Sequence, residues 1–192
     1  MAGLSTELAP VIAASTRWLA RAYPPADSGP AAHTRVEMQA RDAVTVAALL
    51  RYPTELDAQL VAIAGPGGSA VLDWRAGNEP GYSSPGGSSA GGSSPGGGDD
   101  YDEDDEGWRT WVDEVVVSWA ACLLADPMLA VRAVKAVTPN DLGDGRRLLA
   151  PDEADRTAAV LLRHPDLLEP IAGLHRDALL YLLPAPTSAQ SD

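Results

Sequence analysis

A segment near the middle of the chain offers almost nothing to a hydrophobic core, and it constrains the fold more than any other feature. Of the 22 residues from 77 to 98, 18 are Gly, Ser or Pro. Residues 83–97 are three copies of a five-residue unit, Ser-Ser-Pro-Gly-Gly or Ser-Ser-Ala-Gly-Gly. This composition is typical of a flexible coil. The core must therefore be built from the two parts of the chain that flank the segment.

An acidic run follows this segment directly. Seven carboxylates fall within eight residues, namely Asp99, Asp100, Asp102, Glu103, Asp104, Asp105 and Glu106. The whole chain has a net charge of −13, so the remainder carries only −6. The run is interpreted either as a solubilising, self-repelling tether or as an electrostatic bait for a basic partner, which would include masking a nucleic-acid site on that partner.

The composition predicts four regions. They are an N-terminal helical module at 1–64, a flexible Gly/Ser-rich and then acidic linker at 65–106, a C-terminal helical module at 107–184, and a disordered tail at 185–192. As a coil, the linker would span roughly 35 Å. Its flexible part starts only at Gly77 if Val71, Leu72 and Trp74 contact a folded neighbour. The two modules are expected to be either separate small bundles or two halves of one bundle.

Apolar spacing predicts helices throughout both modules. In the first module the expected helices cover 10–22, 31–51 and 53–64, the last through Leu56, Leu60 and Ile63. In the second module one helix with a Trp-rich face is expected from Trp108 to Leu123. Further helices are expected at 127–137, from 151, and from 165 to 183. The fold class is therefore predicted to be all-α, built of helix–Pro–helix hairpins.

A Leu-Leu-x-x-Pro motif occurs three times, at 49–53, 123–127 and 161–165. Proline ends the preceding helix and favours the start of the next, so each copy predicts a tight corner between two helices. The repetition has two interpretations: either any corner of this kind selects these residues, or one helical hairpin was duplicated.

Two of these corners carry a resemblance to a known family. Residues 161–168, Leu-Leu-Arg-His-Pro-Asp-Leu-Leu, resemble the hairpin of the helicase-interaction domain at the C-terminus of bacterial primases. Residues 123–127, followed by Thr138-Pro139-Asn140-Asp141-Leu142, are similar to the N-terminal domain of the replicative helicase. At Leu142 that family has an aromatic residue. The resemblance implies a helical fold that acts in protein–protein contact without catalysis.

Other features of the sequence argue against several classes of protein. The single cysteine, Cys122, argues against a disulfide scaffold. The negative net charge argues against direct binding of nucleic acid. The sequence has no run of 18 apolar residues and no basic stretch before its first apolar run, so neither a membrane span nor a signal peptide is expected. A cytoplasmic location is expected by default.

No catalytic, cofactor or metal motif is convincing, and none is predicted. The glycines at 65–68 imitate a dinucleotide-binding turn, but the helix that should follow is replaced by the Gly/Ser segment. Three histidines and one cysteine show no zinc spacing. Cys122 has no basic neighbour in sequence that would stabilise a thiolate, so it is expected to be a small buried residue.

The sequence therefore predicts a non-enzymatic adaptor whose partner is another protein, a basic one if the acidic run is a bait. The resemblance implies an accessory of a replication helicase or primase. The candidate partner-binding residues are Trp108, Trp111, Leu162, Arg163, Arg51 and Tyr52. Core packing is the alternative role for the two tryptophans, because their spacing is that of a buried helix face. Two alternative functions stay open: a structural or assembly protein of a phage or large complex, and a small enzyme of unrecognised type.

Overall fold

Helices alone make up the folded part of the chain in the computed structural model, which describes residues 4–25, 29–77, 103–137 and 145–185. Within these residues there is no strand, which confirms the all-α prediction. Residues 78–102, which make up most of the predicted linker, lie outside the described residues, and so does the tail from 186 onward. Among the described residues no helix is both long and apolar enough to cross a membrane.

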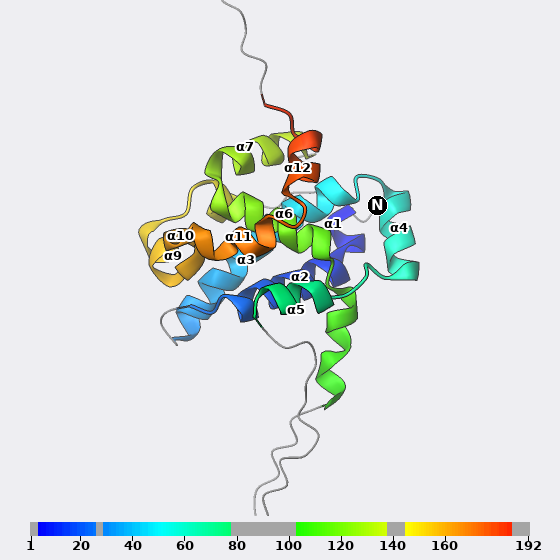
Figure 1. Ribbon diagram of the computed structural model, residues 1–192, viewed down its shortest axis with the longest axis horizontal. Helices are drawn as coiled ribbons and strands as arrows, with labels where there is room; N and C mark the ends of the chain where they lie inside the picture. Colours follow the sequence, from blue (N-terminus) through cyan, green and yellow to red (C-terminus); the bar gives the residue numbers. More distant parts are fainter. Residues whose placement is uncertain (1–3, 26–28, 78–102, 138–144, 186–192) are drawn as a thin grey trace, which may run out of the picture.

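Two helices form the centre of the molecule, α3 (Pro30–Arg51) and α6 (Glu114–Ala125). Helix α6 is buried on nearly every side from Val116 to Leu124, as expected for a helix that is apolar all round. Helix α2 (Ala9–Ala22) packs on α3, and α11 (Glu169–Ala172) packs on α6. The other elements surround this centre (Figure 1). They are α1 (Leu4–Glu7), α4 (Glu55–Ala64), α5 (Ala70–Arg75), η1 (Glu103–Trp111), α7 (Pro127–Ala136), α8 (Arg146–Leu149), α9 (Glu153–Ala158), α10 (Val160–Arg163), η2 (Pro165–Leu168) and α12 (Arg176–Leu182).

One hydrophobic core holds residues from both sides of the Gly/Ser segment. It includes Val44 and Ala47 of α3 together with Val117 and Leu123 of α6, all almost fully buried. Because α3 and α6 are buried against each other, the two flanking parts of the chain pack as halves of one bundle.

The Pro corners adopt one common backbone conformation. Tyr52, Asp126 and His164 precede the three prolines and have φ near −125 to −131° with ψ of 72, 99 and 69°. A following proline disfavours the helical region for the residue before it, and all three residues lie outside that region. The first leucine of each motif is buried, at Leu49, Leu123 and Leu161. The predicted helix–Pro–helix geometry is therefore confirmed.

Short helices occupy both ends of the predicted linker. Within residues 65–77, α5 buries Leu72 and Asp73. Asp73 accepts hydrogen bonds from Trp18 Nε1 (2.8 Å) and from Ser69 Oγ (2.9 Å). Arg109 of η1 donates to the same carboxylate at 2.8 Å. This cluster fixes α5 and η1, which lie on opposite sides of residues 78–102 in the chain, against α2.

Two long helices predicted from the sequence are interrupted. The expected helix from Trp108 to Leu123 is split at Val112 and Asp113, because Asp113 caps α6 by accepting a hydrogen bond from Val116 N. The expected helix from 165 to 183 is divided into η2, α11 and α12. There the hydroxyl of Ser118 accepts from His175 N between α11 and α12. The first interruption thus coincides with a local capping hydrogen bond, and the second with a tertiary hydrogen bond to a buried hydroxyl.

Candidate protein-interaction surfaces

Helix α4 presents apolar side chains to solvent along one face. Leu56, Leu60 and Ile63 are 63, 56 and 84% exposed. Their spacing of four and three residues places them in a row, which we call the α4 stripe. The sequence analysis predicted this helix but not which of its faces is exposed. The buried face of α4 is the opposite one, with the smaller Ala58 and Val61.

Local interactions account for the stability of α4 despite its exposed apolar face. Thr54 and Asp57 form a capping box, in which Asp57 N donates to Thr54 Oγ1 and Thr54 N donates to Asp57 Oδ2. The helix ends at Gly65, whose φ of +75° is rarely adopted by other residues. Near this end Ile63, Gly65 and Trp111 line a shallow hollow of about 430 Å³. Trp111, one of the predicted partner-binding residues, therefore extends the stripe beyond Ile63.

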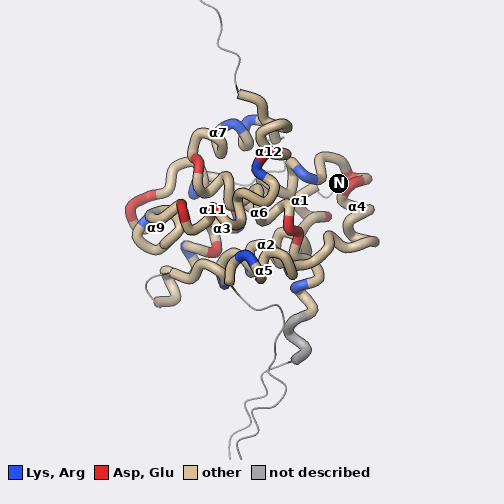
Figure 2. Tube along the Cα trace, in the orientation of Figure 1, with Lys and Arg blue, Asp and Glu red and all other residues tan. Residues whose placement is uncertain are grey.

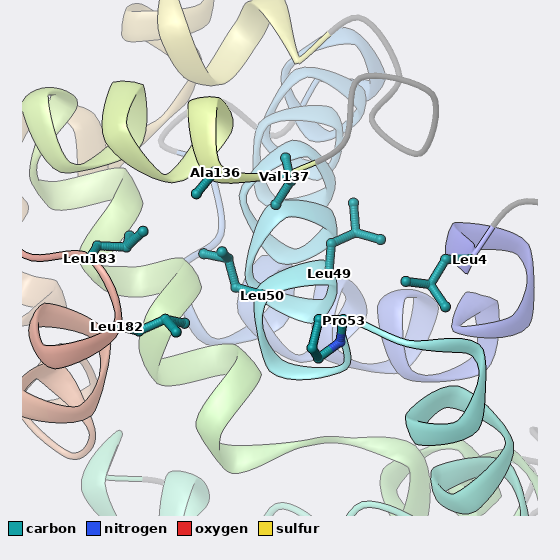
Figure 3. A pocket seen from close by; sticks show the side chains of 8 residues that line it. All are labelled: Leu4, Leu49, Leu50, Pro53, Ala136, Val137, Leu182 and Leu183. Carbon is teal, nitrogen blue, oxygen red and sulfur yellow. The ribbon is translucent and has the colours of Figure 1, made fainter.

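A second apolar surface lies between α7, α12 and the end of α3. One hollow of about 240 Å³ is shown in Figure 3 and is lined by Leu4, Leu49, Leu50, Pro53, Ala136, Val137, Leu182 and Leu183. A neighbouring hollow of about 700 Å³ is lined by Met128, Val131, Arg132, Lys135, Ala136, Leu182, Leu183 and Pro184. The two share Ala136, Leu182 and Leu183, so we treat them as one surface, the α7–α12 groove.

The charged side chains that line this groove are both basic. Arg132 and Lys135 belong to α7, which carries blue segments in Figure 2. Nη2 of Arg132 is buried and has no hydrogen-bond partner among the described residues. Lys135 is exposed, and the positive charges of both side chains favour a carboxylate in the groove. The groove is therefore suited to an apolar occupant that carries negative charge.

The predicted site residue Trp108 lies in a cluster of arginines. The guanidinium groups of Arg17, Arg21 and Arg109 stand 4.8, 5.2 and 5.2 Å from the centre of its ring. Trp108 is half-buried, and its Nε1 has no hydrogen-bond partner among the described residues. Its ring packs against the core, which is one of the two roles considered for it, and also stacks with these cations; its role in partner binding stays a prediction.

The other predicted residues occupy different parts of the molecule. The Tyr52 hydroxyl donates to Asp113, and the Arg51 guanidinium lies 5.7 Å from the Tyr52 ring centre. Leu162 is half-buried against the core in α10, which lies at the opposite end of Figure 1 from α4. The side chain of Arg163 lies outside the described residues. Tyr52 therefore lies just before the start of α4, and Trp111 lies beside its end. Leu162 is separated from both.

The side chains with catalytic potential are engaged in structural contacts. Cys122 is buried with Sγ 3.3 Å from the carbonyl oxygen of Ala172, and burial raises the pKa of its thiol. A thiol with a raised pKa is a poor nucleophile at neutral pH. The Ser118 hydroxyl donates to the same carbonyl oxygen, and His175 Nε2 lies 2.7 Å from Glu114 Oε1. His164 is exposed, and its side chain makes no capping hydrogen bond at its corner. In the part of the chain that the structure describes, no group of three or more metal-ligating side chains was found.

Comparisons of this chain with family models, with curated proteins and with solved structures found no match. The resemblance to the primase and helicase domains therefore stays a prediction. Sequence reasoning missed the α4 stripe and the α7–α12 groove. The sequence contained the spacing of the stripe, but it had no signal to distinguish a row of leucines that is buried from one that is exposed.

Proposed function

We propose that this chain is a protein-interaction module, an adaptor or assembly component without catalytic activity of its own. The observation that carries the proposal is the α4 stripe. Three large aliphatic side chains at a spacing of four and three residues form the pattern with which amphipathic helices bind in grooves of partner proteins. A continuous exposed apolar surface of this kind is a mark of an interaction site.

The remaining features agree with this function. The α7–α12 groove is a second exposed apolar surface, and the buried Cys122 and the hydrogen-bonded Ser118 are not available as nucleophiles. An accessory role beside a replicative helicase or primase is the more specific form of the proposal. It rests only on the Leu-Leu-x-x-Pro corners and the sequence that surrounds them.

The test places a photo-crosslinking amino acid at Leu60 in the full chain, expressed in its native cell. We expect a discrete crosslinked species that disappears when Leu56 and Ile63 are replaced by Gln. The same crosslinker at Met38, an exposed apolar residue of α3, is the control. Equal crosslinking at Leu60 and Met38, or crosslinking that survives the Gln replacements, contradicts the proposal.

A stability measurement separates binding from folding. Because the stripe is exposed, Leu60→Gln should change the free energy of unfolding by less than about 0.5 kcal/mol, as exposed substitutions generally do. Val61→Gln on the buried face should lower it by about 2 kcal/mol or more, because an amide replaces a packed side chain. Urea titration of both variants measures the two values. A large loss in Leu60→Gln would mean that the stripe supports the fold and is not a free binding surface.

A further inference from the structure

We propose that the occupant of the α7–α12 groove is helix α4 of a second copy of this chain, so that two copies form a reciprocal dimer. This inference rests on the proposed function and deepens it by naming the partner. It is drawn from the match between two surfaces described above: one is an apolar row on a convex helix, and the other is an apolar hollow with a basic rim.

The apolar parts of the two surfaces are complementary in kind. The stripe offers Leu56, Leu60 and Ile63, which are branched aliphatic side chains with more than half of their surface exposed. The groove offers exposed apolar surface at Met128, which is 71% exposed, and at Leu182. Seating the row in the groove removes both surfaces from water, and burial of apolar surface is the main driving force of association.

The charges are complementary as well. Helix α4 has acidic side chains at Glu55 and Asp57 in its first turn, and the groove has Arg132 and Lys135. The carboxylate of Asp57 is already bound in the capping box with Thr54. Of the two carboxylates, Glu55 is therefore the one available to a partner. A carboxylate in the groove would be attracted by the positive charges of Arg132 and Lys135, which line it.

The positions of the two surfaces permit a closed, two-fold arrangement. Leu50 and Pro53 form one wall of the groove, and α4 begins two residues after Pro53. Figure 3 shows Pro53 at the edge of the groove, where the chain turns toward α4. The N-terminal end of α4 therefore adjoins the groove. With a two-fold axis beside Pro53, helix α4 of each copy would lie in the groove of the other. Such a self-complementary contact is typical of symmetric dimers.

The net charge of −13 opposes association of two copies. A control variant must therefore change the net charge by the same amount as the test variant. Lys135→Glu in the groove and Arg156→Glu in α9 change the net charge by the same amount. Arg156 is exposed and lies on α9, at the far side of the molecule from α4 in Figure 1. A loss of dimer in Lys135→Glu beyond that in Arg156→Glu therefore reports the local contact.

The experiment measures the molar mass of the full chain by sedimentation equilibrium over a wide range of protein concentration. We expect the mass of two chains at the upper end of the range. Replacing Leu60 and Ile63 together by Gln should raise the dissociation constant at least about tenfold. Lys135→Glu should also raise it, and combining Lys135→Glu with Glu55→Lys should restore part of the affinity because the pair of charges is exchanged across the contact.

Three results would overturn the inference: a monomer at every concentration, a dimer that none of these variants weakens, or species larger than two chains that grow with concentration. A monomer that still crosslinks to another protein through Leu60 overturns the second copy as partner while leaving the proposed function standing. Circular dichroism of each variant shows whether it is folded, so a loss of dimer is not confused with a loss of structure.

Discussion

The carboxylate of Asp73 connects three segments that are distant in the sequence. It is 5% exposed and accepts hydrogen bonds from Trp18, Ser69 and Arg109. We expect Asp73→Ala to lower the free energy of unfolding by about 3 kcal/mol, because it removes the buried carboxylate that Trp18, Ser69 and Arg109 share as acceptor. Urea unfolding measures the change. Asp177→Ala, at an exposed position of α12, is the control and should lose less than about 1 kcal/mol.

Tyr52 makes the stability of the protein sensitive to alkaline pH. Burial and its hydrogen bond to Asp113 raise the pKa of Tyr52 above its ordinary value of 10.0. A pKa that is higher in the folded than in the unfolded state contributes stability that is complete below pH 10 and is lost as the pH rises toward the folded value.

The matched variant for this prediction is Tyr52→Phe, which keeps the ring and removes the ionisable hydroxyl. Between pH 9 and 11 the free energy of unfolding should fall more steeply in the natural chain than in Tyr52→Phe. Groups that titrate in both chains, including Tyr23, contribute equally to both curves. Identical curves would show that the hydroxyl of Tyr52 is not linked to folding.

The stability of helix α7 depends on its N-cap residue, Asp126, which directly precedes the helix. Asp126 Oδ1 accepts hydrogen bonds from Met128 N (2.9 Å) and Leu129 N (3.1 Å), which would otherwise lack a partner at the start of the helix. Asp126→Ala should lower the free energy of unfolding by about 1 kcal/mol, and Asp126→Asn by less, since both Asp and Asn are good caps. Thermal unfolding of the two variants tests this order. A loss as large in Asn as in Ala would contradict the capping role.

The helices show which structural features sequence patterns can predict. The bounds of α2, α3 and α7 and the three Pro corners follow from proline placement and apolar spacing, which are local properties. The face that each helix buries is not local. For α4 the spacing of Leu56, Leu60 and Ile63 predicted a helix, but the face that it buries carries the smaller Ala58 and Val61, and the helix packs on α1.

For the whole molecule, the shared core predicts that the halves stay together when the chain is cut between them. A site for a specific protease is placed within residues 83–97, and the purified protein is cleaved. We expect the two fragments to elute as one particle in gel filtration, since α3 and α6 are buried against each other. Separation of the fragments under native conditions would contradict a common core. Uncleaved protein is the reference for elution.

The sequence alone determined the helical class, the corners, and the absence of a recognisable catalytic motif, because these depend on the residue types and on their spacing along the chain. Only the tertiary structure decided that both halves share one core, that Asp73 and Arg109 join across residues 78–102, and that the candidate surfaces are the α4 stripe and the α7–α12 groove. Burial is a property of pairs of distant segments, and a periodic row of leucines does not reveal whether a neighbour covers it.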